Sequence, residues 1–392
     1  MDKPAVLGGK PTFKSLLPIT KPTLPKLDSL SNRYTEILSS GMITNSKYVK
    51  QFEEELQNYI KVKHALAISS CTSGLMLIIK SLKLKGEIIL PSFTFSASGH
   101  ALIWNNIKPK FVDIDEKTYN IDPKKVNEAI GPKTSAILGV HIFGNPCDIK
   151  ALDDIARDHK IKLIFDAAHA LGSEYKNKRI GRFGHAESFS CSPTKLMVTG
   201  EGGIVTSNID ELKRRIMIGR NYGDDGSYDC EFAGLNARMS ELHAILGLES
   251  LNMLEKNLKN RRKFAEMYIE KLKKLPGIKF QKINSSCRTT FKDFSIYIDS
   301  KKFGLNRDEL SKALAKENIM SRKYFYPPLH KQKAYSRFLK EYKNKLPVTN
   351  NISKNVLSLP LYSHMEIKDV NKVCDAIKRI NGYSGFVRKK LK

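Results

Sequence analysis

The sequence has no closely spaced cysteine pair, no apolar run of membrane-spanning length and too few acidic residues to balance its basic ones. Its six cysteines lie far apart without a CxxC motif, which excludes the usual zinc-site and disulfide patterns. The first residues also lack the basic stretch followed by an apolar block that is typical of a signal peptide. We therefore expect a cytoplasmic protein with reduced cysteines, no metal and no membrane contact.

The chain has 40 acidic residues against 67 lysines and arginines, which gives a net charge of +27. Such an excess is compatible with a nucleic-acid partner, an anionic substrate or a solvated basic surface. Most lysines are scattered, and the clusters at 212–215, 260–263 and 387–392 have no interleaved aromatic residues. We therefore favour a solvated basic surface over nucleic-acid binding.

What the chain does contain is an alternation of short apolar runs and helical patterns, which predicts an α/β fold with a mostly parallel sheet covered on both faces. Helical patterns separate several runs, notably at 123–130 and 148–159. Active sites in such sheets lie at the carboxyl ends of the strands. The seven predicted strands are residues 64–69, 87–90, 110–115, 134–143, 162–169, 187–192 and 202–207.

The pattern also predicts three segments. Residues 1–30, rich in proline and lysine without periodicity, are expected to form an N-terminal arm. Residues 31–250 would form the large domain, and residues 251–392 a smaller C-terminal α+β domain. A helical pattern over residues 240–275, ending at Pro276, is expected to link the two domains.

Three features fall at predicted strand ends. Asp166 follows the apolar run KLIF, and the segment SSCTSG (69–74) offers N–H groups and hydroxyls at the start of a helix. In SFSCSPTKLMVTGEGG (188–203) a strand-like alternation runs to Thr194 and places Lys195 at the strand end. An amine, a carboxylate and an anion cradle are what pyridoxal phosphate requires, for its aldehyde, its ring nitrogen and its phosphate.

Each feature also has an ordinary structural explanation. Lys195 could be a solvated surface lysine, and Asp166 or Thr72 could cap a helix. His169 and Phe95 could be core residues, and Asn236 a turn residue.

Several segments together resemble the DegT/DnrJ/EryC1/StrS family of sugar aminotransferases, which has the fold type I of pyridoxal-phosphate-dependent transferases. The resemblance continues to about residue 270 and fades in the smaller domain. The segments include LGGKP (7–11), TNSKYVKQFEEEL (44–56), PSFTFSASGHAL (91–102), FDAAHALGS (165–173), SFSCSPTKLMVTGEGGIVTSN (188–208) and GLNARMSELHA (234–244).

The resemblance implies a role for each site residue. Lys195 would form an imine with pyridoxal 5'-phosphate and later act as the base, Asp166 would pair with the ring nitrogen, and His169 would lie near the ring. Asn236 would reach the neighbouring subunit's phosphate, which implies a homodimer with a shared active site. The other implied cofactor-binding residues are Cys71, where the family usually has glycine, Thr72, Phe95 and Ser190; Glu201 and Arg238 would support the site.

The implied reaction moves an amino group from L-glutamate to a nucleotide-linked keto-sugar. C4 of an NDP-4-keto-6-deoxyhexose is the favoured target, giving an NDP-4-amino-4,6-dideoxyhexose for a polysaccharide or a glycosylated metabolite. Reaction at C3 of an NDP-3-keto sugar is an alternative. A desulfurase or aldolase on the same fold, or a non-catalytic polyanion-binding protein, also remains open; a desulfurase would need a reactive cysteine in a mobile loop, and none is evident.

Overall fold

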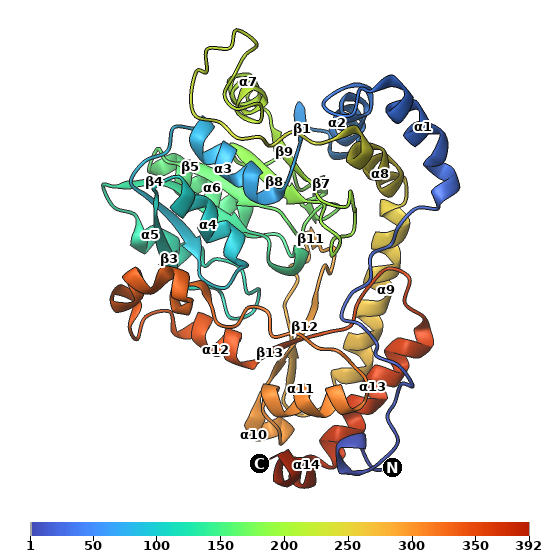
Figure 1. Cartoon of the computed structure of the whole chain (residues 1–392). Coiled ribbons are helices and arrows are strands. Elements are labelled where there is room, and N and C mark those ends of the chain that lie inside the picture. Colours follow the sequence, from blue (N-terminus) through green and yellow to red (C-terminus); the bar gives the residue numbers. More distant parts are fainter. Residues whose placement is uncertain (1, 392) are drawn as a thin grey trace.

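A seven-stranded sheet is the largest element of the computed structural model, which describes residues 2–391 (Figure 1). The strand order is β1-β9-β8-β5-β4-β2-β3, and only β9 runs antiparallel to its neighbours. The predicted α/β fold with a mostly parallel seven-stranded sheet is therefore confirmed. The strands are β1 (His64–Ile68), β2 (Glu87–Pro91), β3 (Lys108–Val112), β4 (Thr134–Val140), β5 (Lys162–Asp166), β8 (Ala186–Ser190) and β9 (Gly203–Ser207).

Both faces of this sheet are apolar and covered by helices. In β5, Leu163 and Phe165 pack with α2, α5, α6 and α8, whereas Ile164 faces α3, α4 and α7. Because side chains alternate along a strand, Asp166 falls on the same face as Ile164. The helices are α1 (Ser31–Ser40), α2 (Lys47–Ile60), α3 (Cys71–Ser81), α4 (Ser96–Trp104), α5 (Pro123–Ala129), α6 (Ile149–Asp158), α7 (Asp210–Gly219) and α8 (Glu241–Asn252).

The strand expected to run to Thr194 ends earlier, so that prediction is wrong. Strand β8 stops at Ser190, and Lys195 lies in a turn of the connection to β9, where its N–H donates to the Ser192 carbonyl over 2.9 Å. Pro193 has no N–H to offer a ladder, which prevents the strand from continuing. The lysine is therefore presented by a loop.

A second, three-stranded antiparallel sheet lies in the C-terminal part, in the order β10-β12-β13. Its members are β10 (Ile278–Phe280), β12 (Phe294–Ile298) and β13 (Val356–Leu359). The remaining elements are α9 (Leu254–Leu272), α10 (Ser300–Phe303), α11 (Arg307–Lys316), α12 (Pro347–Asn355), α13 (Ile367–Gly382), α14 (Ser384–Leu391), the short strands β6 (Glu174–Tyr175), β7 (Lys178–Arg179) and β11 (Cys287–Arg288), and short 3-10 helices.

The helix expected over residues 240–275 is two helices. It breaks at Met253, because α8 packs against α2 whereas α9 packs against α13 in the C-terminal part. In Figure 1, α9 runs down the right-hand side from α8 to the C-terminal part, where it lies beside α13. We therefore retain the division of the chain near residue 250 as a proposal. No helix within residues 2–391 is both long and apolar enough to cross a membrane.

The N-terminal segment is mostly extended, and it packs against the C-terminal part of the chain. Leu17 forms a bridge with Ile319. The buried Glu317 carboxylate accepts the Ala5 N–H over 2.8 Å and the Thr12 hydroxyl over 2.7 Å. The short 3-10 helix Ala5–Leu7 packs against α14 in the C-terminal part (Figure 1).

Candidate active site

A cavity of about 360 Å³ lies at the carboxyl ends of β4, β5 and β8, where the fold predicts a site. All of the predicted cofactor residues except Asn236 line it: Cys71, Thr72, Phe95, Asp166, His169, Ser190 and Lys195. Glu201, expected to support the site, also lines it. Asn236 is exposed outside the cavity and accepts a hydrogen bond from Arg238 over 3.3 Å.

Asp166 is buried, and donors from three elements surround its carboxylate. The Ser98 hydroxyl of α4 donates over 2.6 Å, and the Ala168 N–H donates over 3.1 Å. The Cys71 thiol of α3 lies 3.8 Å away and also donates to the Ser188 carbonyl over 3.4 Å. Burial, with Asp166 nearby, raises the pKa of this thiol well above its usual value. Cys71 is thus a neutral donor in the first turn of α3, where no glycine is needed.

The N-terminus of α3 faces the cavity through Cys71 and Thr72. Ser70 caps this helix and accepts the Ser73 N–H. Within residues 2–391 the N–H groups of Cys71 and Thr72 have no hydrogen-bond partner, which is the usual state of a first helical turn open to an anion. Gly203 makes the approach of β9 possible, since a Cβ there would lie 2.5 Å from the Cys71 nitrogen.

Lys195 is an amine in a poorly solvated place. Burial, together with the positive charge of Lys292, lowers its pKa from the usual range to about 8. Half of the amine is therefore neutral at pH 8, where an ordinary lysine is neutral to less than about 1%. A neutral amine is the form that attacks an aldehyde or accepts a proton.

His169 has an unused ring nitrogen. Its buried Nδ1 has no hydrogen-bond partner within residues 2–391. Burial and the nearby Lys195 and Lys292 lower the pKa of the imidazole well below its usual value, so the ring is neutral. A neutral ring with a free nitrogen can make a directional hydrogen bond to a bound group.

Several residues of the cavity wall are not predicted from the sequence. Lys292, Asp293, Tyr324 and Phe325 line it from the C-terminal part, where the resemblance fades. The one local signal is a lysine and an aspartate side by side just before an apolar strand. Because these residues lie far from Lys195 in the sequence, local patterns do not predict that they line the same cavity.

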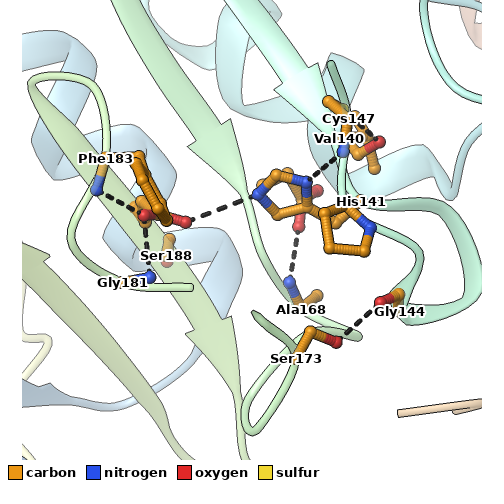
Figure 2. A network of polar contacts seen from close by, with 12 residues as sticks. Val140, His141, Gly144, Cys147, Ala168, Ser173, Gly181, Phe183 and Ser188 are labelled. Carbon is orange, nitrogen blue, oxygen red and sulfur yellow. Dashed lines mark hydrogen bonds and ion pairs between the residues drawn. The ribbon is translucent and has the colours of Figure 1, made fainter. Parts of the chain in front are cut away.

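His141 also lines the cavity and is not predicted from the sequence. Figure 2 shows the network of polar contacts around its ring. Its Nδ1 accepts the Cys147 N–H over 3.0 Å, and its Nε2 lies 3.5 Å from the buried Glu187 carboxylate. The other Glu187 oxygen accepts N–H groups of Gly181 and Phe183. This network fixes the backbone beneath the cavity.

The donor set fits pyridoxal phosphate. Lys195 would hold the aldehyde carbon and Asp166 the ring nitrogen, while His169 Nδ1 is free for a polar ring substituent. The open first turn of α3 and Ser190 would hold the phosphate. A carboxylate, an amine and an anion cradle on an α/β sheet define the class of pyridoxal-phosphate-dependent transferases.

Comparison with known proteins agrees with this class. The model of the DegT/DnrJ/EryC1/StrS aminotransferase family matches residues 27–378, and the chain belongs to that family. An Escherichia coli relative, dTDP-4-amino-4,6-dideoxy-D-glucose transaminase, is 33% identical over 91% of this chain and 96% of its own. An Aneurinibacillus thermoaerophilus relative, dTDP-3-amino-3,6-dideoxy-alpha-D-galactopyranose transaminase, is 34% identical over 88% and 93%.

Solved structures agree as well. DesI, determined in the presence of its TDP-sugar product, superimposes with a TM-score of 0.91 and is 34% identical over 98% of both chains. The ntda protein of Bacillus subtilis, with bound cofactor PMP, has a TM-score of 0.84 and is 27% identical over 91% of this chain and 82% of its own. The predicted family and fold are confirmed.

The cysteines do not suggest desulfurase chemistry. Cys230 does lie in an exposed loop, which the sequence did not indicate, but it is not part of the cavity wall. The other cysteines are buried.

The low proton affinity of Lys195 can be measured directly. In the apoprotein, acetylation with acetic anhydride over pH 6 to 10, analysed by peptide mass spectrometry, is expected to label Lys195 with a midpoint near pH 8. Exposed lysines, with an ordinary pKa of about 10.4, serve as internal controls. A Lys195 midpoint equal to theirs would contradict the burial argument.

Proposed function

We propose that this protein transfers the amino group of L-glutamate to C4 of an NDP-4-keto-6-deoxyhexose, giving an NDP-4-amino-4,6-dideoxyhexose, with pyridoxal phosphate as cofactor. The observation that carries the proposal is one cavity that holds Lys195, Asp166 and His169 beside the open end of α3. Support for the substrate class comes from the E. coli relative and from DesI with its TDP-sugar product.

Pyridoxal phosphate, when bound, supplies an aldehyde and an electron-accepting ring. Lys195 Nζ, being largely neutral above pH 8, can accept the proton that leaves the α-carbon of glutamate and return a proton to the sugar carbon. Asp166, a buried carboxylate fixed by Ser98 and Ala168, would pair with the ring nitrogen and keep it protonated. His169, whose lowered pKa favours the neutral ring, would orient the cofactor ring by a hydrogen bond from its free Nδ1.

A second cavity of about 440 Å³ adjoins the first and shares Thr94, Phe95, Tyr324 and Phe325 with it. Arg322 and Lys323 also line this second cavity. Arg322 has no ion-pair partner within residues 2–391, whereas Lys323 lies 2.7 Å from Asp308. A nucleoside diphosphate needs such cations, so we assign its phosphates to this side of the site.

We also propose a homodimer in which Asn236 completes the site of the neighbouring subunit. Its exposed position outside its own cavity agrees with that role. Sedimentation of the purified protein as a monomer would contradict it.

Replacing Asp166 by Asn should slow the reaction far more than it weakens cofactor binding. Its charge matters most while negative charge develops on the ring, so we expect kcat to fall by about 10²- to 10³-fold. The exchange of the glutamate α-hydrogen in D₂O measures the proton step, and a cofactor titration measures binding. The exposed Asp153→Asn is the matched control and should leave both unchanged. Equal losses in rate and in binding would contradict the assignment of Asp166.

The position of the new amine on the sugar ring tests the proposed reaction at C4. With L-glutamate and a dTDP-4-keto-6-deoxyhexose, NMR of the product is expected to show nitrogen at C4, and Lys195→Ala is expected to give no product. The A. thermoaerophilus relative makes reaction at C3 the specific competitor. Product from a 3-keto sugar alone would overturn the C4 proposal and keep the aminotransferase.

A further inference from the structure

A second lysine, which is buried, lies in the wall of the same cavity. Lys292 and Asp293 adjoin each other immediately before β12, and the Lys292 Nζ lies 2.9 and 3.1 Å from the two Asp293 carboxylate oxygens. Their side chains are only 5% and 7% exposed. Lys292 Nζ also lies 5.7 Å from the centre of the Tyr324 ring.

The backbone around Lys292 is strained and is held by hydrogen bonds from other segments. Phe291 has a φ of +47°, a left-handed conformation that is unusual for a residue with a large side chain. The buried Arg261 guanidinium donates to the Phe291 carbonyl over 3.0 Å and to the Lys292 carbonyl over 2.5 Å. The Lys292 N–H donates to the Phe143 carbonyl over 2.9 Å. Strained backbone fixed from both sides indicates a side chain that must stay where it is.

A buried ion pair is weak evidence for stability, since apolar residues of similar volume often serve equally well. This pair lines the same cavity as Lys195 and is itself buried, so solvent screens its charges less than it would screen a surface pair. The other titratable groups that line the cavity with Lys195 are Cys71, His141, Asp166, His169, Glu201 and Tyr324.

We propose that Lys292 and Asp293 are positioning residues that set the proton affinity of Lys195, Lys292 by lowering it and Asp293 by limiting that effect. This proposal rests on the proposed function, because only in transamination must Lys195 be neutral in order to accept a proton from the amino donor.

The directions of the pKa shifts agree with this arrangement. After burial, the charge of Lys292 is the largest influence that lowers the pKa of Lys195, and Asp293 acts in the opposite direction. Lys292 also lowers the pKa of His169, which keeps that ring neutral. One buried cation therefore favours the neutral form of two groups of the site.

The test measures the acetylation midpoint of Lys195 in apoprotein variants. Lys292→Met removes the cation and leaves Asp293, so the Lys195 midpoint should rise by at least half a pH unit, which is about a threefold slower labelling at pH 7. Asp293→Asn leaves the cation without its carboxylate, so the midpoint should fall. Lys292→Arg keeps the charge and should restore the wild-type midpoint.

The opposite directions separate this proposal from a merely structural role. If the variants only loosened the wall and admitted water, the Lys195 midpoint would rise in both Lys292→Met and Asp293→Asn, towards that of an ordinary lysine. That result would overturn the proposal, and so would midpoints equal to the wild-type value in both variants. Lys279→Met is the matched control, because Lys279 also lies over a tyrosine ring, that of Tyr297, but is exposed and outside the cavity. Circular dichroism confirms that each variant is folded. Absence of transamination in the wild type would refute the proposed function and leave these midpoints as they are.

Discussion

The buried Asp166 carboxylate is the interaction on which the rest of the site depends. A buried carboxylate is costly unless donors surround it, and these come from α3, from α4 and from the turn after β5. Satisfying it therefore brings the first turns of α3 and α4 to the same end of the sheet. Thr72 and Phe95, which begin or precede those helices, reach the cavity for that reason.

The charges of the cavity follow a second constraint. Lys195 is a half-buried amine and Lys292 a buried one, and Asp166 and Asp293 are buried carboxylates of the same cavity. Because Asp166, Lys292 and Asp293 are buried, each of their charges changes the proton affinity of its neighbours more than it would at the surface. Lys195 is thus kept partly neutral, the form that can accept a proton, and the positive charge of Lys292 favours that neutral form. The seven-stranded sheet and the C-terminal part both contribute to this balance.

The sequence predicts those features that local patterns carry. Strands buried on both faces are visible as apolar runs, and Asp166 is visible as the carboxylate that ends one of them. The resemblance adds Lys195, His169 and Ser190, which periodicity alone leaves with ordinary explanations. The strand end before Lys195 is different, because the alternation of side chains continues past the proline that stops the ladder.

Other features depend on contacts between distant segments. Lys292 is about one hundred residues from Lys195, and His141 meets Glu187 only because β4 and β8 flank β5. The break at Met253 depends on which helices α8 and α9 pack against. Asn236 lies outside the cavity of its own chain, so its predicted role needs a second subunit.

We propose above all that Lys195 and Asp166 hold pyridoxal phosphate and use it to accept the amino group of L-glutamate. The most direct test is the visible absorption spectrum of the purified protein with pyridoxal phosphate, recorded before and after addition of L-glutamate, with Lys195→Ala as control. We expect a visible band that depends on Lys195 and disappears with glutamate as pyridoxamine phosphate forms. A wild-type protein that gives the same spectrum as the Lys195→Ala variant, or a band that glutamate leaves unchanged, would contradict it.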